Sequence, residues 1–133
     1  MKNILCFGDS NTWGYDPSTQ TRFPKNIRWT GVLQKLLGSN FNVIEEGLNG
    51  RTTNVDERED HGLGYFRANR SALELLSVTI ETNSPIDLII IMLGTNDLKI
   101  NFKQSSQQIA QNMKSVCESI INNDYFLSKS IIL

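Results

Sequence analysis

The sequence contains an uninterrupted apolar run, Leu88-Ile89-Ile90-Ile91-Met92-Leu93, which lies between Pro85 and the turn residue Gly94. A strand with one face in water alternates apolar and polar residues, whereas no polar residue interrupts this run. The run is therefore typical of a central strand that is covered on both faces, as in parallel sheets. Pro85 separates the run from the helical pattern before it, and Gly94 begins the turn that follows.

Apolar patterns of two types alternate on either side of this run. Short strand-like runs occupy residues 4–7, 41–44 and 130–133, the last of which begins a fourth strand. Helical spacing of apolar residues occupies 29–37, 71–80 and 104–121. The order β-α-β-α-β-α-β predicts an α/β fold with a mostly parallel sheet and right-handed crossovers. Because internal repeats and linkers are absent, residues 1–133 are interpreted as a single domain.

The size and charge of the chain exclude several classes of protein. Its 133 residues suffice for one domain, and 13 Lys and Arg against 14 Asp and Glu give a net charge of −1. Such a balance provides no electrostatic footprint for nucleic acid or for an anionic membrane surface. No apolar stretch reaches the ~20 residues of a membrane span, and the N-terminal apolar run is shorter than a secretory signal requires.

The counts of cysteine and histidine limit the chemistry further. Cys6 and Cys117 lie far apart in apolar stretches and fit neither a disulfide framework nor a zinc knuckle. Reduced cysteines and the lack of a targeting signal predict a soluble, cytoplasmic protein. His61 is the only histidine, which excludes a His-rich metal cage, and we expect neither a metal nor a cofactor.

Polar residues follow the first expected strand, where Gly8-Asp9-Ser10 begins a tight turn from strand to helix. Ligands of open parallel sheets bind at the carboxyl ends of the strands. The Ser10 hydroxyl and the free N–H groups of this turn are therefore placed to act on a ligand. The alternative is an Asp-Ser-Asn turn that only caps a helix.

The ends of the next two strands carry hydrogen-bond donors. Gly47 and Gly50 let the backbone approach a ligand and expose N–H groups, although an ordinary turn is the plainer interpretation. Asn96 places a side-chain amide after the central strand, where an Asx turn is the alternative. Together the three strand ends supply a nucleophile and the donors of an oxyanion hole. A nucleotide-binding domain lacks the support of a Walker A or dinucleotide glycine motif.

These segments together resemble the first three sequence blocks of the SGNH (GDSL-type) serine hydrolases. The blocks are Gly8-Asp9-Ser10, the Gly50 of Leu48-Asn49-Gly50-Arg51-Thr52, and Gly94-Thr95-Asn96-Asp97, within residues 4 to about 102. Residues 28–33, 43–48 and 90–97 more narrowly resemble the branch of arylesterases and acyltransferases with perhydrolase side activity. Asn11 stands where the name-giving motif has Leu, a substitution that the family accommodates.

The resemblance implies a three-layer, flavodoxin-like fold in which helices cover both faces of a parallel sheet. It also implies that Ser10 is the nucleophile, and that the Ser10 N–H, the Gly50 N–H and the Asn96 side-chain amide hold the oxyanion. Asp9 is expected to order the turn, and Trp13 is expected to lie either near the acyl pocket or in the core. The substrate would be a small ester, and this branch tends to form homo-oligomers.

The family's general base is a His in a carboxyl-terminal Asp-x-x-His block, which is absent from this sequence. His61 has Arg58 rather than an Asp three residues before it, and it is interpreted as a solvated loop residue or a substitute base. The sequence stops within the apolar strand at 131–133, which predicts a C-terminally truncated fold that lacks its last strand and closing helix.

Two functional hypotheses follow from these observations. The first is a serine esterase or acyltransferase that acts through an acyl-serine and is impaired in this chain, because a serine hydroxyl needs a base to take its proton. The second is a non-catalytic binding or interaction module that kept the hydrolase fold.

Overall fold

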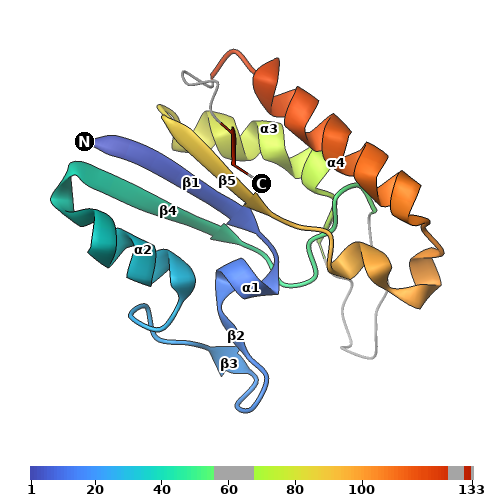
Figure 1. Cartoon of the computed structure of the whole chain (residues 1–133), viewed down its shortest axis with the longest axis horizontal. Helices are drawn as coiled ribbons and strands as arrows, with labels where there is room; N and C mark the ends of the chain where they lie inside the picture. Colours follow the sequence, from blue (N-terminus) through green and yellow to red (C-terminus); the bar gives the residue numbers. More distant parts are fainter. Residues whose placement is uncertain (56–67, 126–130, 133) are drawn as a thin grey trace.

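A computed structural model describes residues 1–55, 68–125 and 131–132 of the chain (Figure 1). Its main sheet has four strands in the order β4-β1-β5-β6, and every neighbouring pair is parallel. These strands are β1 (Lys2–Gly8), β4 (Phe41–Gly47), β5 (Leu88–Met92) and β6 (Ile131–Ile132). The predicted parallel sheet is confirmed, and the apolar run that begins at Leu88 forms a strand between two neighbours.

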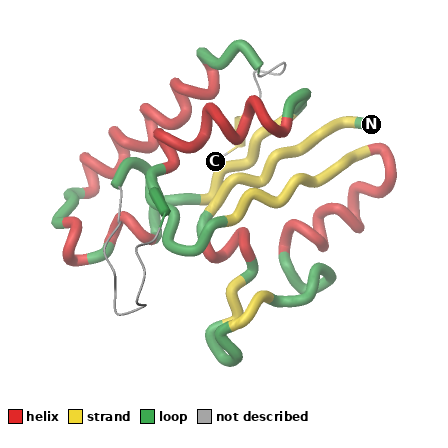
Figure 2. The backbone as a smooth tube through the Cα atoms, turned by 180° about the vertical axis from the view of Figure 1, so that it is seen from behind, coloured by secondary structure: helices red, strands yellow, loops and turns green. Residues whose placement is uncertain are grey.

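Helices cover both faces of this sheet, as Figures 1 and 2 show. Along β1, Cys6 points to one face and Phe7 to the other, because successive side chains of a strand alternate. On the first face, α2 (Trp29–Leu37) contributes Trp29, Leu33 and Leu37 to the core. On the second face, α3 (Ala72–Asn83) and α4 (Ser106–Ile121) contribute Leu76, Ile80, Val116 and Ile120. The expected three-layer arrangement is thus confirmed.

Local sequence signals set the ends of the helices. α2 ends at Leu37 and is capped by Gly38, whose φ of 73° with a ψ of −164° is a conformation that glycine adopts readily. α4 begins with a capping box, in which the Ser105 hydroxyl accepts from the Gln108 N–H and the Gln108 side chain accepts from the Ser105 N–H. This box makes Ser106, rather than residue 104, the first residue of α4. No helix within the described ranges is both long and apolar enough to cross a membrane.

Several short elements lie between these longer ones. They are α1 (Ser10–Trp13), β2 (Tyr15–Asp16), β3 (Thr21–Arg22), η1 (Gly38–Asn40), η2 (Asn96–Leu98) and η3 (Ile100–Phe102). β2 and β3 form a separate antiparallel hairpin beside α1 (Figure 1). In the turn of this hairpin, the hydroxyl and the N–H of Ser18 both donate hydrogen bonds to the Asp16 carboxylate. These bonds order the turn and lower the pKa of Asp16. The sequence does not predict the hairpin, because two-residue strands are too short to show an alternating pattern.

The strand order places a topological switch point between β1 and β5. The connection after β1 leads to β4 on one side, whereas β5 lies on the other side of β1. Ligands of open α/β sheets bind at such points, outside the carboxyl ends of the strands. Ser10 follows β1 and Asn96 follows β5, so two of the predicted site residues stand at this point.

Candidate active site

Ser10 is the first residue of α1, and Asp9 caps that helix. The Asp9 carboxylate accepts hydrogen bonds from the Asn11 N–H at 2.9 Å and from the Asn11 side-chain amide at 3.1 Å. The Asp9 carbonyl accepts from the N–H groups of Thr12 and Trp13. Asp9 therefore orders the turn that carries Ser10, the predicted nucleophile.

Two glycines let α1 lie against the ends of the strands. A Cβ atom at Gly47 would come within 2.1 Å of the Trp13 backbone nitrogen, and one at Gly8 would come within 2.1 Å of Thr12 Oγ1. Side chains do not fit at either distance, so β1 and β4 need glycine where α1 packs on them. The position of Ser10 relative to the sheet therefore depends on both glycines.

Gly50 lies in a β-turn that follows β4. The Arg51 N–H donates to the Leu48 carbonyl at 3.0 Å, and Gly50 has a φ of 80°. When only the third of a turn's four residues has a positive φ, the turn is of type II, and glycine is favoured at that position. The Leu48 N–H donates to the Gly8 carbonyl at 3.0 Å. The turn that carries Gly50 is thereby joined to the strand that leads to Ser10.

Asn96 connects the three strand ends. It begins η2, and its side-chain nitrogen Nδ2 donates to the Arg51 carbonyl at 3.0 Å. The same nitrogen lies 3.4 Å from Oδ2 of Asp9. Since Arg51 follows Gly50 and Asp9 precedes Ser10, the amide stands between the two backbone segments that carry the other predicted donors. The 3.4 Å contact is long for a hydrogen bond, so the second amide N–H is only weakly engaged.

Arg51 is a residue of this site whose importance the sequence pattern does not reveal. It is 4% exposed, and its Nη1 donates to the carbonyls of Gly8, at 3.0 Å, and Glu46. The guanidinium carbon lies 3.8 Å from the centre of the Phe7 ring, a close cation–π contact. Burial lowers the pKa of Arg51 to about 10, so the group is protonated at neutral pH. Arginine is mostly exposed in proteins, and no pattern in a single sequence marks a buried one.

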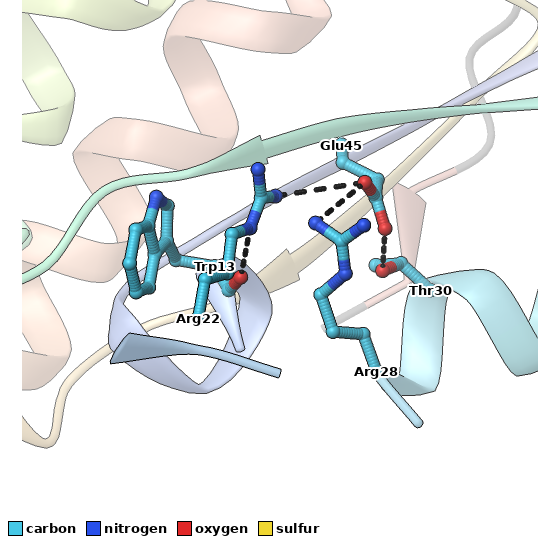
Figure 3. Close-up of polar contacts among 5 residues, drawn as sticks. All are labelled: Trp13, Arg22, Arg28, Thr30 and Glu45. Atoms are coloured by element: carbon cyan, nitrogen blue, oxygen red, sulfur yellow. Dashed lines mark hydrogen bonds and ion pairs between the residues drawn. The ribbon is translucent and has the colours of Figure 1, made fainter. Parts of the chain in front are cut away.

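Trp13, expected in the acyl pocket or in the core, is half-buried at the end of α1. The Arg22 guanidinium lies 5.2 Å from the centre of its ring, and Arg22 Nε donates to the Trp13 carbonyl at 2.6 Å. Glu45 Oε2 pairs with Arg22 at 3.5 Å and with Arg28 at 3.1 Å (Figure 3). The Thr30 hydroxyl donates to the other oxygen of this carboxylate. Polar and cationic neighbours thus anchor Trp13, and its contact with an acyl group stays a prediction.

Cys6, which lies on β1 ahead of Ser10, is not an alternative nucleophile. Cys6 is fully buried, and this burial, with a smaller effect of the Glu45 charge, raises the pKa of its thiol to about 12. A thiol that stays protonated is a poor nucleophile, so Cys6 does not compete with Ser10. His61 lies outside the described residues. Within 1–55, 68–125 and 131–132, no three or more His, Cys, Asp or Glu side chains are grouped to hold a metal ion.

Comparison with known proteins relates these features to a family. The family model of the GDSL-like lipases and acylhydrolases matches residues 6–127. No curated protein matches the chain. Among solved structures, the M. smegmatis aryl esterase is 40% identical with a TM-score of 0.81, and 98% of this chain and 60% of that chain are covered. A carbohydrate acetylesterase family member from Sinorhizobium meliloti is 38% identical with a TM-score of 0.84, at coverages of 98% and 58%.

A more distant likeness supports the fold alone. The SGNH-hydrolase family esterase AlinE4 is 23% identical with a TM-score of 0.68, and 93% of this chain and 55% of that chain are covered. This chain spans less than two thirds of the length of each of these three structures. The family model, in contrast, covers most of the chain and includes the segments of Ser10, Gly50 and Asn96. The chain belongs to the GDSL-like lipase/acylhydrolase family, the SGNH hydrolases, which are carboxylic ester hydrolases.

Proposed function

We propose that this chain carries the acyl-serine site of a serine esterase or acyltransferase that acts on small acyl esters. The observation that supports this most directly is the position of the Asn96 amide, which lies between Asp9, beside Ser10, and Arg51, beside Gly50. An amide, a glycine N–H and a serine at the ends of three adjacent strands match the needs of acyl transfer, which requires a nucleophile and donors to an oxyanion.

The proposed reaction proceeds in two steps. The Ser10 Oγ attacks the ester carbonyl carbon while its proton passes to a base, and the carbonyl oxygen becomes an oxyanion. The Ser10 N–H, the Gly50 N–H and the Asn96 amide would hold this oxyanion, and one such donor contributes ~2.7–4 kcal/mol in measured cases. The bond to the alcohol then breaks, the alcohol leaves with a proton, and Ser10 is acylated. Water releases the carboxylic acid, or a second alcohol takes the acyl group.

The base is the part of this reaction that these residues do not provide in the family's usual form. His61 is the only histidine, and Arg58 rather than Asp stands three residues before it. Triad enzymes without their base keep a residual acceleration of about 10³–10⁴ over water, which comes from the oxyanion hole and from binding. We therefore expect these 133 residues alone to turn over esters slowly.

Replacement of Ser10 by alanine tests the proposal. The natural gene product should hydrolyse p-nitrophenyl acetate, and Ser10→Ala should lower kcat by at least ~10³-fold. Rapid quenching followed by peptide mass spectrometry should find the acetyl group on Ser10. Ser77→Ala is the matched control, because Ser77 is exposed on α3 and should be dispensable. Equal activity of both variants would overturn the proposal.

The alternative is a non-catalytic binding or interaction module that kept the hydrolase fold. Such a module would be soluble and monodisperse as the natural gene product, and p-nitrophenyl acetate would leave no acetyl group on Ser10. An acetylated Ser10 that hydrolyses slowly would instead support an acyl-serine site with an impaired second step.

A further inference from the structure

Arg51 touches each of the three strand ends that form the proposed site. Its guanidinium donates to the Gly8 carbonyl at the end of β1 and to the Glu46 carbonyl near the end of β4. Its own carbonyl accepts from the Asn96 side chain that follows β5. The contacts therefore join three segments that are distant in sequence and that lie together at this edge of the sheet.

These contacts lie very close to the proposed oxyanion donors. Gly8 is two residues before Ser10, and Gly50 is directly before Arg51. The third donor, Asn96, is bonded to Arg51 itself, at 3.0 Å. A movement of Arg51 would consequently displace the Gly50 N–H and the Asn96 amide together.

The surroundings of Arg51 argue against a role in stability alone. A charged group at 4% exposure has lost most of its contact with water, which is costly unless all of its donors are satisfied. Among the described residues, Arg51 Nε has no hydrogen-bond partner. A buried cation with an unpaired donor contributes less to stability than an apolar side chain of similar size can. The fixed stacking on Phe7, at 3.8 Å, nevertheless defines where the guanidinium lies.

We propose that Arg51 is a positioning residue, which holds the Gly50 N–H and the Asn96 amide in the arrangement that the oxyanion requires. It does so without touching the substrate, through its guanidinium bonds to the strand ends and its carbonyl bond to Asn96. This inference rests on the proposed acyl-serine function. It adds a residue whose role is to fix two donors that come from different strands.

The test compares Arg51→Met with Arg51→Lys in the natural gene product. Methionine keeps an apolar stem over Phe7 but removes both bonds to the carbonyls, whereas lysine keeps a cation that can reach one of them. Misplacement of a catalytic group by about 1 Å costs ~10²-fold in rate, so Arg51→Met should lower kcat on p-nitrophenyl acetate by about 100-fold. KM should change by roughly twofold or less, because the lost interaction acts in the transition state. Arg51→Lys should recover part of kcat.

Val116→Ala is the matched control. Val116 is fully buried on α4, in the core that α3 and α4 form with the sheet, and it is not among the contacts of the proposed site. This variant should lose stability while its kcat, corrected for the folded fraction, stays near that of the unmodified protein. The proposal is overturned if Arg51→Met and Val116→Ala lower kcat equally at matched folded fractions.

A second measurement separates failure of this inference from failure of the proposed function. If Ser10→Ala shows that activity does not depend on Ser10, the proposed function fails by itself. The side-chain amide resonances of Asn96 and the N–H resonance of Gly50 still report their positions by NMR. Positioning by Arg51 requires both resonances to shift in Arg51→Lys, which should remain folded, and not in Val116→Ala. Unchanged resonances in Arg51→Lys would overturn the inference.

Discussion

The carboxylate of Asp97 holds Thr53 through both its backbone and its hydroxyl. The Thr53 N–H lies 3.0 and 3.1 Å from the two carboxylate oxygens, and the hydroxyl donates to one of them at 2.5 Å. Both residues are fully buried. Asp97 follows Asn96, and the Thr53 carbonyl accepts from the Leu73 N–H at the start of α3. This pair therefore fixes the segment after β5 to the segment after β4, directly beside the proposed oxyanion donors.

Thr53→Val should reveal the contribution of this pair to stability. Valine has nearly the same shape but cannot donate, so a buried carboxylate loses one of its hydrogen bonds. The free energy of unfolding should fall by about 1.5–3 kcal/mol, the range for hydrogen bonds to charged groups. Thr53→Ser keeps the hydroxyl and loses one methyl group, so its loss should be about 0.8 kcal/mol. Urea denaturation measures both, and equal losses would show that the hydroxyl is not what matters.

The two arginines that share Glu45 should contribute unequally. The Arg28 side chain is 9% exposed and the Arg22 side chain is 37% exposed. Arg28→Met leaves a largely buried carboxylate short of a partner and should lower the free energy of unfolding by about 1.5–3 kcal/mol. Arg22→Met removes a pair that solvent screens and should cost about 1 kcal/mol or less. A larger loss for Arg22→Met in urea denaturation would contradict this ranking.

Gly47→Ala should disturb the nucleophile through the backbone. The added Cβ would meet the Trp13 nitrogen at 2.1 Å, so α1 must move away from β4. Overpacking of this kind costs about 1–3 kcal/mol, and the displaced turn should also slow acetylation of Ser10 by p-nitrophenyl acetate.

Gly38→Ala provides the control for that substitution. Its Cβ would have nothing within 4 Å, but the φ of 73° with a ψ of −164° strains any other residue, by about 1–3 kcal/mol. It should therefore destabilise the protein without changing the acetylation rate of Ser10. A rate that falls equally in both variants would show that loss of stability, not displacement of α1, slows the reaction.

The sequence predicts those parts of the fold that depend on apolar periodicity. The stripe at 29–37 coincides with α2, which packs Trp29, Leu33 and Leu37 against the core. The run at 88–93 contains β5, which ends one residue earlier, at Met92. α3 extends three residues beyond the predicted end at 80, through polar residues. The hydroxyl of Thr82 and the amide of Asn83 donate to carbonyls one turn earlier, which supports a helix that periodicity does not reveal.

The candidate site is less predictable, for a physical reason. Ser10, Gly50 and Asn96 follow strands in the sequence, so the rule that parallel strands end at one edge suffices to group them. Arg51 and Asp97 act by hydrogen bonds to residues far away in the sequence. Whether such a charged residue is buried depends on the assembled fold, and a local pattern carries no sign of it.

Cys6 should make stability depend on alkaline pH. Burial raises its pKa from 9.0 to about 12, so the unfolded chain releases the thiol proton at a lower pH than the folded protein does. The contribution is complete below pH 9.0 and is lost as the pH rises from there towards about 12, at about 1.4 kcal/mol per pH unit. Urea denaturation of the unmodified protein and of Cys6→Ala isolates this effect, since Cys117 and all other groups titrate in both. The stability advantage of the unmodified protein should shrink by about 1.4 kcal/mol between about pH 8 and about pH 10. A difference that stays constant over this interval would mean that Cys6 ionises equally well in the folded protein.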